Sequence, residues 1–172
     1  MRMRMYYPAL LGLAMLVATL NASGPGVPST TSDDREALAA VVQQLDAAYN
    51  AQDAARFSAL FAEDGNFQFP VEGVVLRGRN EIRQHFARQF ATHAPLRHVT
   101  TTGEIDHIGP GILAVDVQVD IQSIDPKTGA AQTLIRYDGL SLGIQTDSGW
   151  RIRLVRLYPV AKQPAAATRA TE

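Results

Sequence analysis

Residues 112–124 read ILAVDVQVDIQSI, and this stretch decides the fold class. Successive side chains of a β-strand point to opposite faces, so its alternating residues separate into two sets. One set is apolar and the other is polar: Val115, Val117, Val119 and Ile121 against Asp116, Gln118, Asp120 and Gln122. Such a strand is typical of an antiparallel sheet that covers a core on one side only. The polar face is then left to water or to a partner subunit.

Further strands are expected on both sides of this stretch. Residues 97–108 are rich in Thr and end at the turn 109–111, which reads GPG. Residues 125–129, DPKTG, have the composition of a hairpin loop, and we expect strands at 133–144 and 150–160 after it. Together these segments predict an antiparallel meander.

Helices are expected in the first half of the chain. Apolar residues recur at helical spacing over residues 38–49, so a first helix buries one face. Asp53 has the side chain of an N-cap for a second helix, and Gly65 ends that helix because glycine tolerates a left-handed turn. A third helix follows Gly78. Two short strands are expected between the second and third helices, at residues 66–69 and 74–76. Helices first and a meander second predict an α+β fold.

The two ends of the chain differ in composition from its middle. Arg2 and Arg4 precede the apolar run Ala9–Leu20, which has the length of a signal-peptide core rather than of a membrane span. We therefore expect a signal peptide at residues 1–23, a linker at 24–31, a folded domain at 32–160 and a disordered tail at 161–172. The protein would be periplasmic or secreted, and a retained N-terminal anchor is the alternative.

Charge and residue types exclude several kinds of partner. The 172 residues carry a net charge of −1 and contain no run of Lys and Arg. Neither nucleic acid nor a membrane is therefore expected as a partner of the mature domain. The absence of Cys excludes disulfides and thiolate chemistry. No metal-ligand spacing stands out among the His, Asp and Glu residues, so no metal and no cofactor is predicted.

Several short motifs, taken in order, resemble those of a known family. They are YNAQD at 49–53, LFAEDGNF at 60–67, LRGRNEI at 76–82, RHVT at 97–100, GWRI at 149–152 and YPV at 158–160. Their order and spacing are similar to the nuclear-transport-factor-2-like superfamily, and within it to the SnoaL-like group. The resemblance covers essentially the whole domain. It implies a cone-shaped, curved antiparallel sheet wrapped around three N-terminal helices, with a pocket inside the cone for a small-molecule ligand. It also implies a homodimer formed through the outer face of the sheet.

The catalytic residues of ketosteroid isomerase, an enzyme of similar fold, have no counterpart in this sequence. The resemblance puts its base at Phe69, its tyrosine donor near Leu45 and its protonated aspartate near Leu140. All three positions are apolar here. The resemblance to the fold therefore does not extend to that reaction, which needs a base and a hydrogen-bond donor in the pocket.

Scytalone dehydratase, another enzyme of similar fold, ends its first helix with a Tyr-Asp pair. The corresponding pair here is Tyr49-Asn50, and Asn cannot take up a proton. His98, in contrast, matches a pocket His of that enzyme and its relatives, and His suits proton transfer near neutral pH. The predicted catalytic set is therefore His98, Tyr49 and Asp138. The alternative for His98 is a half-buried ring that bonds to a backbone carbonyl.

Arg136 and Asp138 lie two residues apart on one predicted strand and share a face with Leu140. If that face lines the cone, the pair could bind a carboxylate or polarise a carbonyl. The alternatives are a structural ion pair near the sheet edge and a one-residue slip that turns both side chains to the outer face. The remaining predicted wall of the pocket is apolar and consists of Phe57, Phe61, Phe69, Phe86, Phe90, Val117 and Leu140.

Three functions are compatible with this pattern. The aromatic cone and the missing carboxylates favour an exported module that binds a small apolar or amphipathic molecule. The retained His98 and Tyr49 favour instead a dehydratase, isomerase or cyclase, so whether the protein is an enzyme, at most of the lyase or isomerase type, is left open. The third is a dimeric interaction protein whose cone is filled by its own side chains.

Overall fold

Helices and strands follow one another along residues 32–161, the part of the chain that the computed structural model describes. The helices are α1 (Ser32–Asn50), α2 (Ala54–Ala59) and α3 (Gly78–Thr92). The strands are β1 (Phe61–Phe69), β2 (Val74–Arg77), β3 (Arg97–Gly109), β4 (Ile112–Ile124), β5 (Ala131–Thr146) and β6 (Gly149–Pro159). Within residues 32–161, no helix is long and apolar enough to cross a membrane. The predicted signal peptide, the linker and residues 162–172 of the tail lie outside the described residues.

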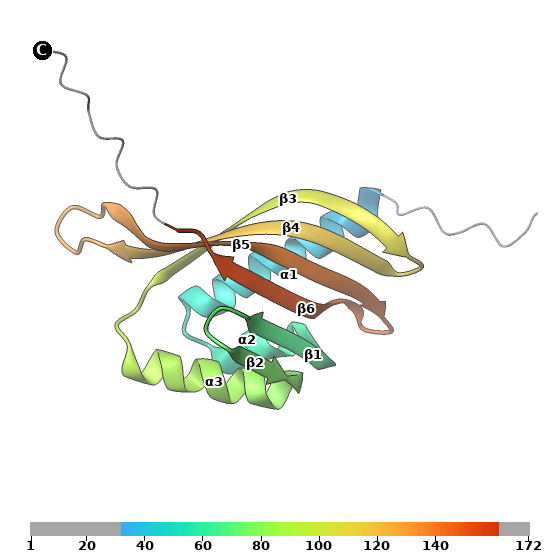
Figure 1. Ribbon diagram of the computed structural model, residues 1–172, viewed down its shortest axis with the longest axis horizontal. Coiled ribbons are helices and arrows are strands. Elements are labelled where there is room, and N and C mark those ends of the chain that lie inside the picture. Colours follow the sequence, from blue (N-terminus) through green and yellow to red (C-terminus); the bar gives the residue numbers. More distant parts are fainter. Residues whose placement is uncertain (1–31, 162–172) are drawn as a thin grey trace, which may run out of the picture.

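The strands form one curved, unclosed sheet in the order β2-β1-β6-β5-β4-β3 (Figure 1). Neighbouring strands are antiparallel except β1 and β6, which run parallel. Helix α1 lies along one face of the sheet, and α3 lies beside β1 and β2 (Figure 1). The predicted α+β class, with helices before the long antiparallel strands, is confirmed. Strand β3 forms one edge of the sheet, so half of its backbone groups have no neighbouring strand to bond with.

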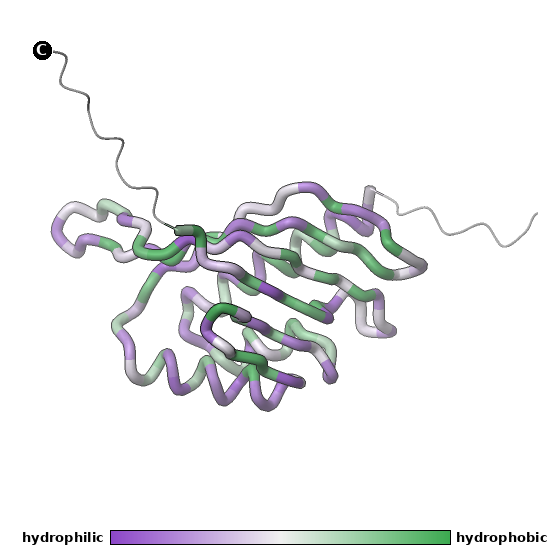
Figure 2. The backbone as a smooth tube through the Cα atoms, in the orientation of Figure 1, coloured by the Kyte–Doolittle hydropathy of each residue, from purple (hydrophilic) through white to green (hydrophobic). Residues whose placement is uncertain are grey.

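The core lies between α1 and the inner face of the sheet. The alternation that residues 112–124 predict is confirmed, because Leu113, Val115, Val117 and Val119 of β4 are buried. From the other side, α1 buries Leu38, Val41, Val42, Leu45 and Ala48. Figure 2 shows the alternation of apolar and polar residues along the long strands. This burial of apolar surface is the main force that holds helix and sheet together.

The start of β1 corrects one prediction from the sequence. Asp53 caps α2 as predicted, since its Oδ1 accepts from the Arg56 N–H at 2.9 Å. The helix ends at Ala59, however, and the strand begins at Phe61, which pairs with Ile152 of β6. Gly65 does not form a left-handed turn but lies in an irregular stretch of β1. A side chain there would collide with backbone, because a Cβ at Gly65 would lie 2.9 Å from the Ala62 carbonyl oxygen.

The register of β5 corrects a second prediction. The inner face of this strand carries Tyr137, Gly139, Ser141 and Gly143, whereas Arg136, Asp138 and Leu140 lie exposed on the outer face. Glycines are needed on the inner side because neighbours approach closely. A Cβ at Gly143 would lie 2.5 Å from Leu38 Cδ1, and one at Gly139 would meet the Arg156 carbonyl oxygen. The apolar residues on the Leu140 side of β5 predicted that this side faces the core, but it is the outer face of the sheet.

Candidate functional site

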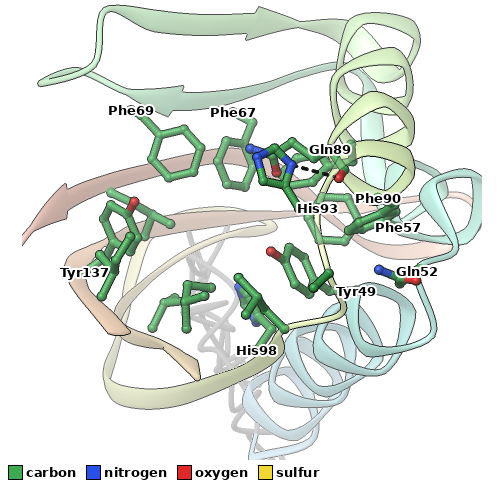
Figure 3. A pocket seen from close by; sticks show the side chains of 17 residues that line it. Tyr49, Gln52, Phe57, Phe67, Phe69, Gln89, Phe90, His93, His98 and Tyr137 are labelled. Atoms are coloured by element: carbon green, nitrogen blue, oxygen red, sulfur yellow. Dashed lines mark hydrogen bonds between the residues drawn. The ribbon is translucent and has the colours of Figure 1, made fainter. Parts of the chain in front are cut away.

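A cavity of about 160 Å³ opens between the C-terminal end of α1, helix α3 and the sheet (Figure 3). Its wall is mainly aromatic. Of the predicted wall residues, Phe57, Phe69, Phe86 and Phe90 line it, together with Phe67 and Tyr137, which were not in the predicted wall. Phe61 does not line it, because its ring is fully buried in the core between Phe57 and Phe67. Val117 lines a smaller inner cavity of about 30 Å³, behind the first.

Tyr49 occupies the centre of the aromatic wall. Its ring makes edge-to-face contacts with Phe57, Phe86 and Phe90, at centroid distances of 6.2, 6.1 and 5.1 Å. Such contacts fix a ring more firmly than area burial alone. Figure 3 shows the Tyr49 hydroxyl directed into the cavity. Burial raises the pKa of the Tyr49 phenol, and the nearby Tyr137 phenol raises it further. Tyr49 therefore stays a neutral hydrogen-bond donor.

His98 of β3 faces the cavity from the sheet, and its side chain is only 7% exposed. Its Nδ1 lies 2.7 Å from Asp46 Oδ1, an acidic residue of α1. The predicted alternative, a ring bonded to a backbone carbonyl, is wrong, because the partner is a carboxylate. The Tyr49 ring lies 4.6 Å from the His98 ring, centroid to centroid. The structure thus brings His98 and Tyr49 together, as predicted, and adds Asp46.

Two side chains of α1 hold this part of β3 in place. Asp46 Oδ2 accepts from the Thr100 N–H at 2.7 Å, and Oδ1 accepts from the Thr100 hydroxyl at 2.6 Å. Asn50, one helical turn later, accepts from the His98 N–H at 2.7 Å and donates to the His98 carbonyl at 2.9 Å. Because β3 is an edge strand, these side chains bond the backbone groups that no neighbouring strand reaches. His98 is therefore fixed through both its backbone and its ring.

The electrostatics of Asp46 define which nitrogen of His98 carries the proton. Burial raises the pKa of the Asp46 carboxyl, but hydrogen bonds from His98 and Thr100 lower it further, so the net shift is downward. An ionised carboxylate only accepts, so Nδ1 carries the proton that lies between the two groups. In the neutral ring Nε2 then holds a free lone pair. Nε2 makes no hydrogen bond within residues 32–161.

Asp46 was not among the residues predicted for the site. A signal for it existed, because Asp46 follows the buried Leu45 and lies four residues before Asn50, which places both polar side chains on one edge of the apolar stripe of α1. What the sequence could not show was that this edge meets His98, which lies 52 positions later. The carboxylate that seemed lost at position 50 is therefore supplied one turn earlier.

The polar rim of the cavity consists of Gln52, Gln89 and His93 (Figure 3). His93 Nδ1 lies 3.1 Å from the Gln89 carbonyl oxygen and 2.9 Å from the Thr92 hydroxyl. Neither Asp, Glu, Lys nor Arg is among the residues that line the cavity. Over the described part of the chain, no group of three His, Asp or Glu side chains could hold a metal ion. The site therefore offers hydrogen bonds and two imidazoles, His98 on the inner wall and His93 at the rim, without a carboxylate, Lys or Arg on its wall.

The other predicted site residues lie on the far side of the sheet. Arg136 donates to Asp120, with Nε 2.7 Å from Oδ1, and Asp138 accepts from Gln118 at 3.0 Å. Leu140 is 37% exposed. The prediction that they line the pocket is wrong. The inner positions of β5 belong to Tyr137, Gly139, Ser141 and Gly143, which alternate with these outward-facing residues. Arg136 and Asp138 thus lie away from His98 and Tyr49.

Comparisons with known proteins agree with this architecture. A family model described as the SnoaL-like domain matches residues 41–161. No curated protein matches the chain. Three solved structures illustrate what it is similar to. A domain of unknown function with a cystatin-like fold from Nostoc punctiforme is 25% identical, over 79% of this chain and 82% of its own, with a TM-score of 0.64.

The other two structures share less sequence and show the fold alone. A nuclear-transport-factor-2-like protein with a cystatin-like fold from Novosphingobium aromaticivorans is 17% identical, over 78% of this chain and 86% of its own, with a TM-score of 0.61. A ketosteroid isomerase-like protein from Erwinia carotovora atroseptica is 16% identical, over 78% and 100%, also with a TM-score of 0.61. The resemblance drawn from the six motifs is confirmed at the level of family and fold.

Proposed function

The chain belongs to the SnoaL-like domain family, and we propose that it binds a small, mainly apolar molecule in its cavity and removes a proton from it with His98. The family alone does not carry this proposal, because one fold can serve enzymes and plain binding proteins. It is carried by the pair of Asp46 and His98, with the free Nε2 turned to an aromatic cavity.

The pair has the parts that a general base needs. A neutral imidazole takes up a proton near neutral pH, provided that its lone pair reaches the reacting group. Asp46 holds the ring in the tautomer with Nε2 free, and its negative charge stabilises the imidazolium that forms. The low exposure of His98 keeps water from competing for the same nitrogen. A structural His has no need of a free nitrogen facing a cavity.

The chemistry follows from the atoms present. His98 Nε2 takes a proton from a carbon next to a carbonyl group, and the electron pair of the broken C–H bond forms the C=C bond of an enolate. The negative charge moves to the carbonyl oxygen, where the neutral phenol of Tyr49 or Tyr137 donates a hydrogen bond. If the substrate has a C=C bond between its β- and γ-carbons, return of the proton from the imidazolium to the γ-carbon completes an isomerisation. If it has a hydroxyl on the β-carbon, the C–O bond breaks, the hydroxyl takes the proton from the imidazolium and leaves as water, and a dehydration is complete. Neither outcome needs a cofactor.

The second candidate is binding without turnover. It is favoured by the wall itself, which offers mainly aromatic rings and neutral amides and no carboxylate. Pockets of this kind are typical of sites that hold apolar ligands. The third function considered above, a cone filled by its own side chains, is disfavoured by the cavity of about 160 Å³.

A proton-exchange experiment separates the two candidates. Acetophenone has one aromatic ring and acidic protons next to its carbonyl, so it serves as a probe of base catalysis without knowledge of the natural substrate. In deuterium oxide, the proton NMR signal of its methyl group disappears as the base exchanges these protons. We expect the protein to accelerate the exchange and His98→Gln to reduce the acceleration at least ~100-fold, the usual contribution of a general base.

His107→Gln is the matched control, because His107 lies on the same strand but does not line the cavity. It should leave exchange unchanged. Binding of acetophenone, followed by chemical-shift changes of the protein, is measured in parallel. Binding without accelerated exchange would leave only the second candidate. No binding at all would remove both.

A further inference from the structure

The turn between α1 and α2 contains an unusual backbone conformation at Gln52. Its φ is +53°, and it is the one residue other than glycine with a positive φ among residues 32–161. The Gln52 N–H donates to the Tyr49 carbonyl at 2.8 Å, and the Asp53 N–H donates to the Ala48 carbonyl at 3.0 Å. This pair of bonds ends α1 and requires a left-handed residue at position 52. Glycine is the usual choice there, because a Cβ crowds the following carbonyl oxygen.

The side chain of Gln52 explains why position 52 departs from that choice. It is half-buried and lines the cavity, and Figure 3 shows it at the end of α1 beside Tyr49. Its carboxamide makes no hydrogen bond to any residue that the structure describes. Residues other than glycine that are held in a strained backbone conformation cluster at ligand sites, where the side chain has a role that glycine could not fill. The amide is therefore left without a protein partner at the rim of the cavity.

We infer that Gln52 is a ligand-binding residue that determines specificity, and that the ligand presents an uncharged polar group to it. This inference rests on the proposed binding function of the cavity. A carboxamide can donate and accept, so it matches a carbonyl, hydroxyl or amide group of the ligand. Because no Lys or Arg is among the lining residues, a carboxylate would enter without a counter-charge.

The size of the cavity limits the ligand further. A dry cavity of ~150 Å³ in another protein holds one benzene molecule. The cavity here, about 160 Å³ and open at the rim, accommodates a single six-membered ring whose substituent extends toward Gln52. The ligand class is therefore an uncharged, single-ring molecule with a carbonyl or hydroxyl group.

Three variants test Gln52 with two probes of similar shape. The probes are acetophenone, which carries a carbonyl group, and isopropylbenzene, which carries no polar group; their affinities are measured by NMR titration. Gln52→Gly should raise the melting temperature by ~2–4 °C, because glycine relieves the left-handed strain. It should also weaken binding of acetophenone ~10-fold, the effect of one lost hydrogen bond, and that of isopropylbenzene less than ~2-fold.

Gln52→Leu keeps a side chain and the strain but removes the amide, so it should show the same selective loss of affinity at an unchanged melting temperature. Ala51→Gly is the matched control in the same turn, on an exposed residue outside the cavity, and should leave both affinities unchanged. A lower melting temperature in Gln52→Gly, or equal losses for both probes, would overturn the inference while leaving the proposed binding intact. If neither probe binds the unaltered protein, the proposed function fails, and this inference fails with it.

Discussion

Two contacts of equal length between a carboxylate and a nitrogen donor lie on opposite faces of the same sheet. On the inner face, His98 Nδ1 is 2.7 Å from Asp46 Oδ1, with side chains 7% and 20% exposed. On the outer face, Arg136 Nε is 2.7 Å from Asp120 Oδ1, with side chains 45% and 18% exposed. Distance alone does not distinguish the two pairs. Their surroundings do, because an ion pair is screened in water and strengthened where water is excluded.

The partners of each pair differ in the same way. Asp46 also bonds the backbone and hydroxyl of Thr100, so it fixes an edge strand and orients a ring that faces the cavity. The outer pair joins β4 to β5, whose backbones are already paired with each other. The inner pair is therefore needed to position the residues of the site, whereas the outer pair links two strands that are already paired without it.

The largest effect is expected from removing the inner carboxylate. Asp46→Ala leaves His98 Nδ1, the Thr100 N–H and the Thr100 hydroxyl without their acceptor in a partly buried place. We expect the free energy of unfolding to fall by ~3 kcal/mol, as for other broken buried pairs. Urea denaturation followed by circular dichroism measures this change.

Asp120→Ala is the matched control for that loss, since it breaks a pair of the same length on the outer face. It should lose less than a third as much stability, in line with other exposed pairs. Equal losses in the two variants would show that exposure does not distinguish the pairs.

The second effect concerns acid. Because the pKa of Asp46 is lowered in the folded protein, the unfolded chain binds more protons at acidic pH. The stability from this group is therefore complete above the unfolded pKa of ~4 and is lost as the pH falls through the lower folded pKa. The stability difference between the unaltered protein and Asp46→Asn should shrink as the pH falls below ~5. Urea titrations at several pH values test this; a difference that grows toward low pH would contradict it.

The two faces also show what the sequence could and could not predict. The strand at residues 112–124 was readable, because its apolar side chains alternate without interruption and bury against a helix. Strand β5 was misread, because its apolar residues Leu140 and Leu142 face outward while Gly139 and Gly143 face inward. A hydrophobic pattern assumes that large apolar residues fill the core. It fails where the neighbouring helix and strand come so close that only glycine fits.

The candidate site divides along the same line. His98, Tyr49 and the Phe positions could be predicted, because residue type and helical or strand spacing place them on the core side. Asp46 could not, because its role depends on a contact between α1 and β3 across 52 positions of the chain. Gln52 could not either, because only coordinates reveal a positive φ at a residue other than glycine. Long-range pairing and local backbone strain leave little trace in a single sequence.

The third effect concerns association through the outer face, which the family resemblance predicts for a homodimer. Leu140 is 37% exposed there and lies between Asp116 and Arg156 on the adjacent strands. If two copies pair through this face, Leu140→Glu places a charge in the apolar part of the interface and should weaken dimerisation ~10-fold, or ~1.4 kcal/mol. Light scattering after gel filtration measures the mass over a range of concentrations. A protein that is monomeric at every concentration would contradict the prediction.

The smallest effect is expected from Arg136, the residue that the sequence placed in the pocket. Its side chain lies on the outer face and pairs with Asp120, and Tyr137 takes the inner position next to it. Arg136→Ala should therefore leave the affinity for acetophenone unchanged, whereas Tyr137→Phe, at the neighbouring position, removes a hydroxyl from the wall and should weaken binding. Both affinities come from the same NMR titration. A loss of binding in Arg136→Ala alone would mean that the ligand is held by the outer face and not by the aromatic cavity. The side chain of Arg136 points away from His98, and it could reach the cavity only if β5 slipped by one residue in the sheet.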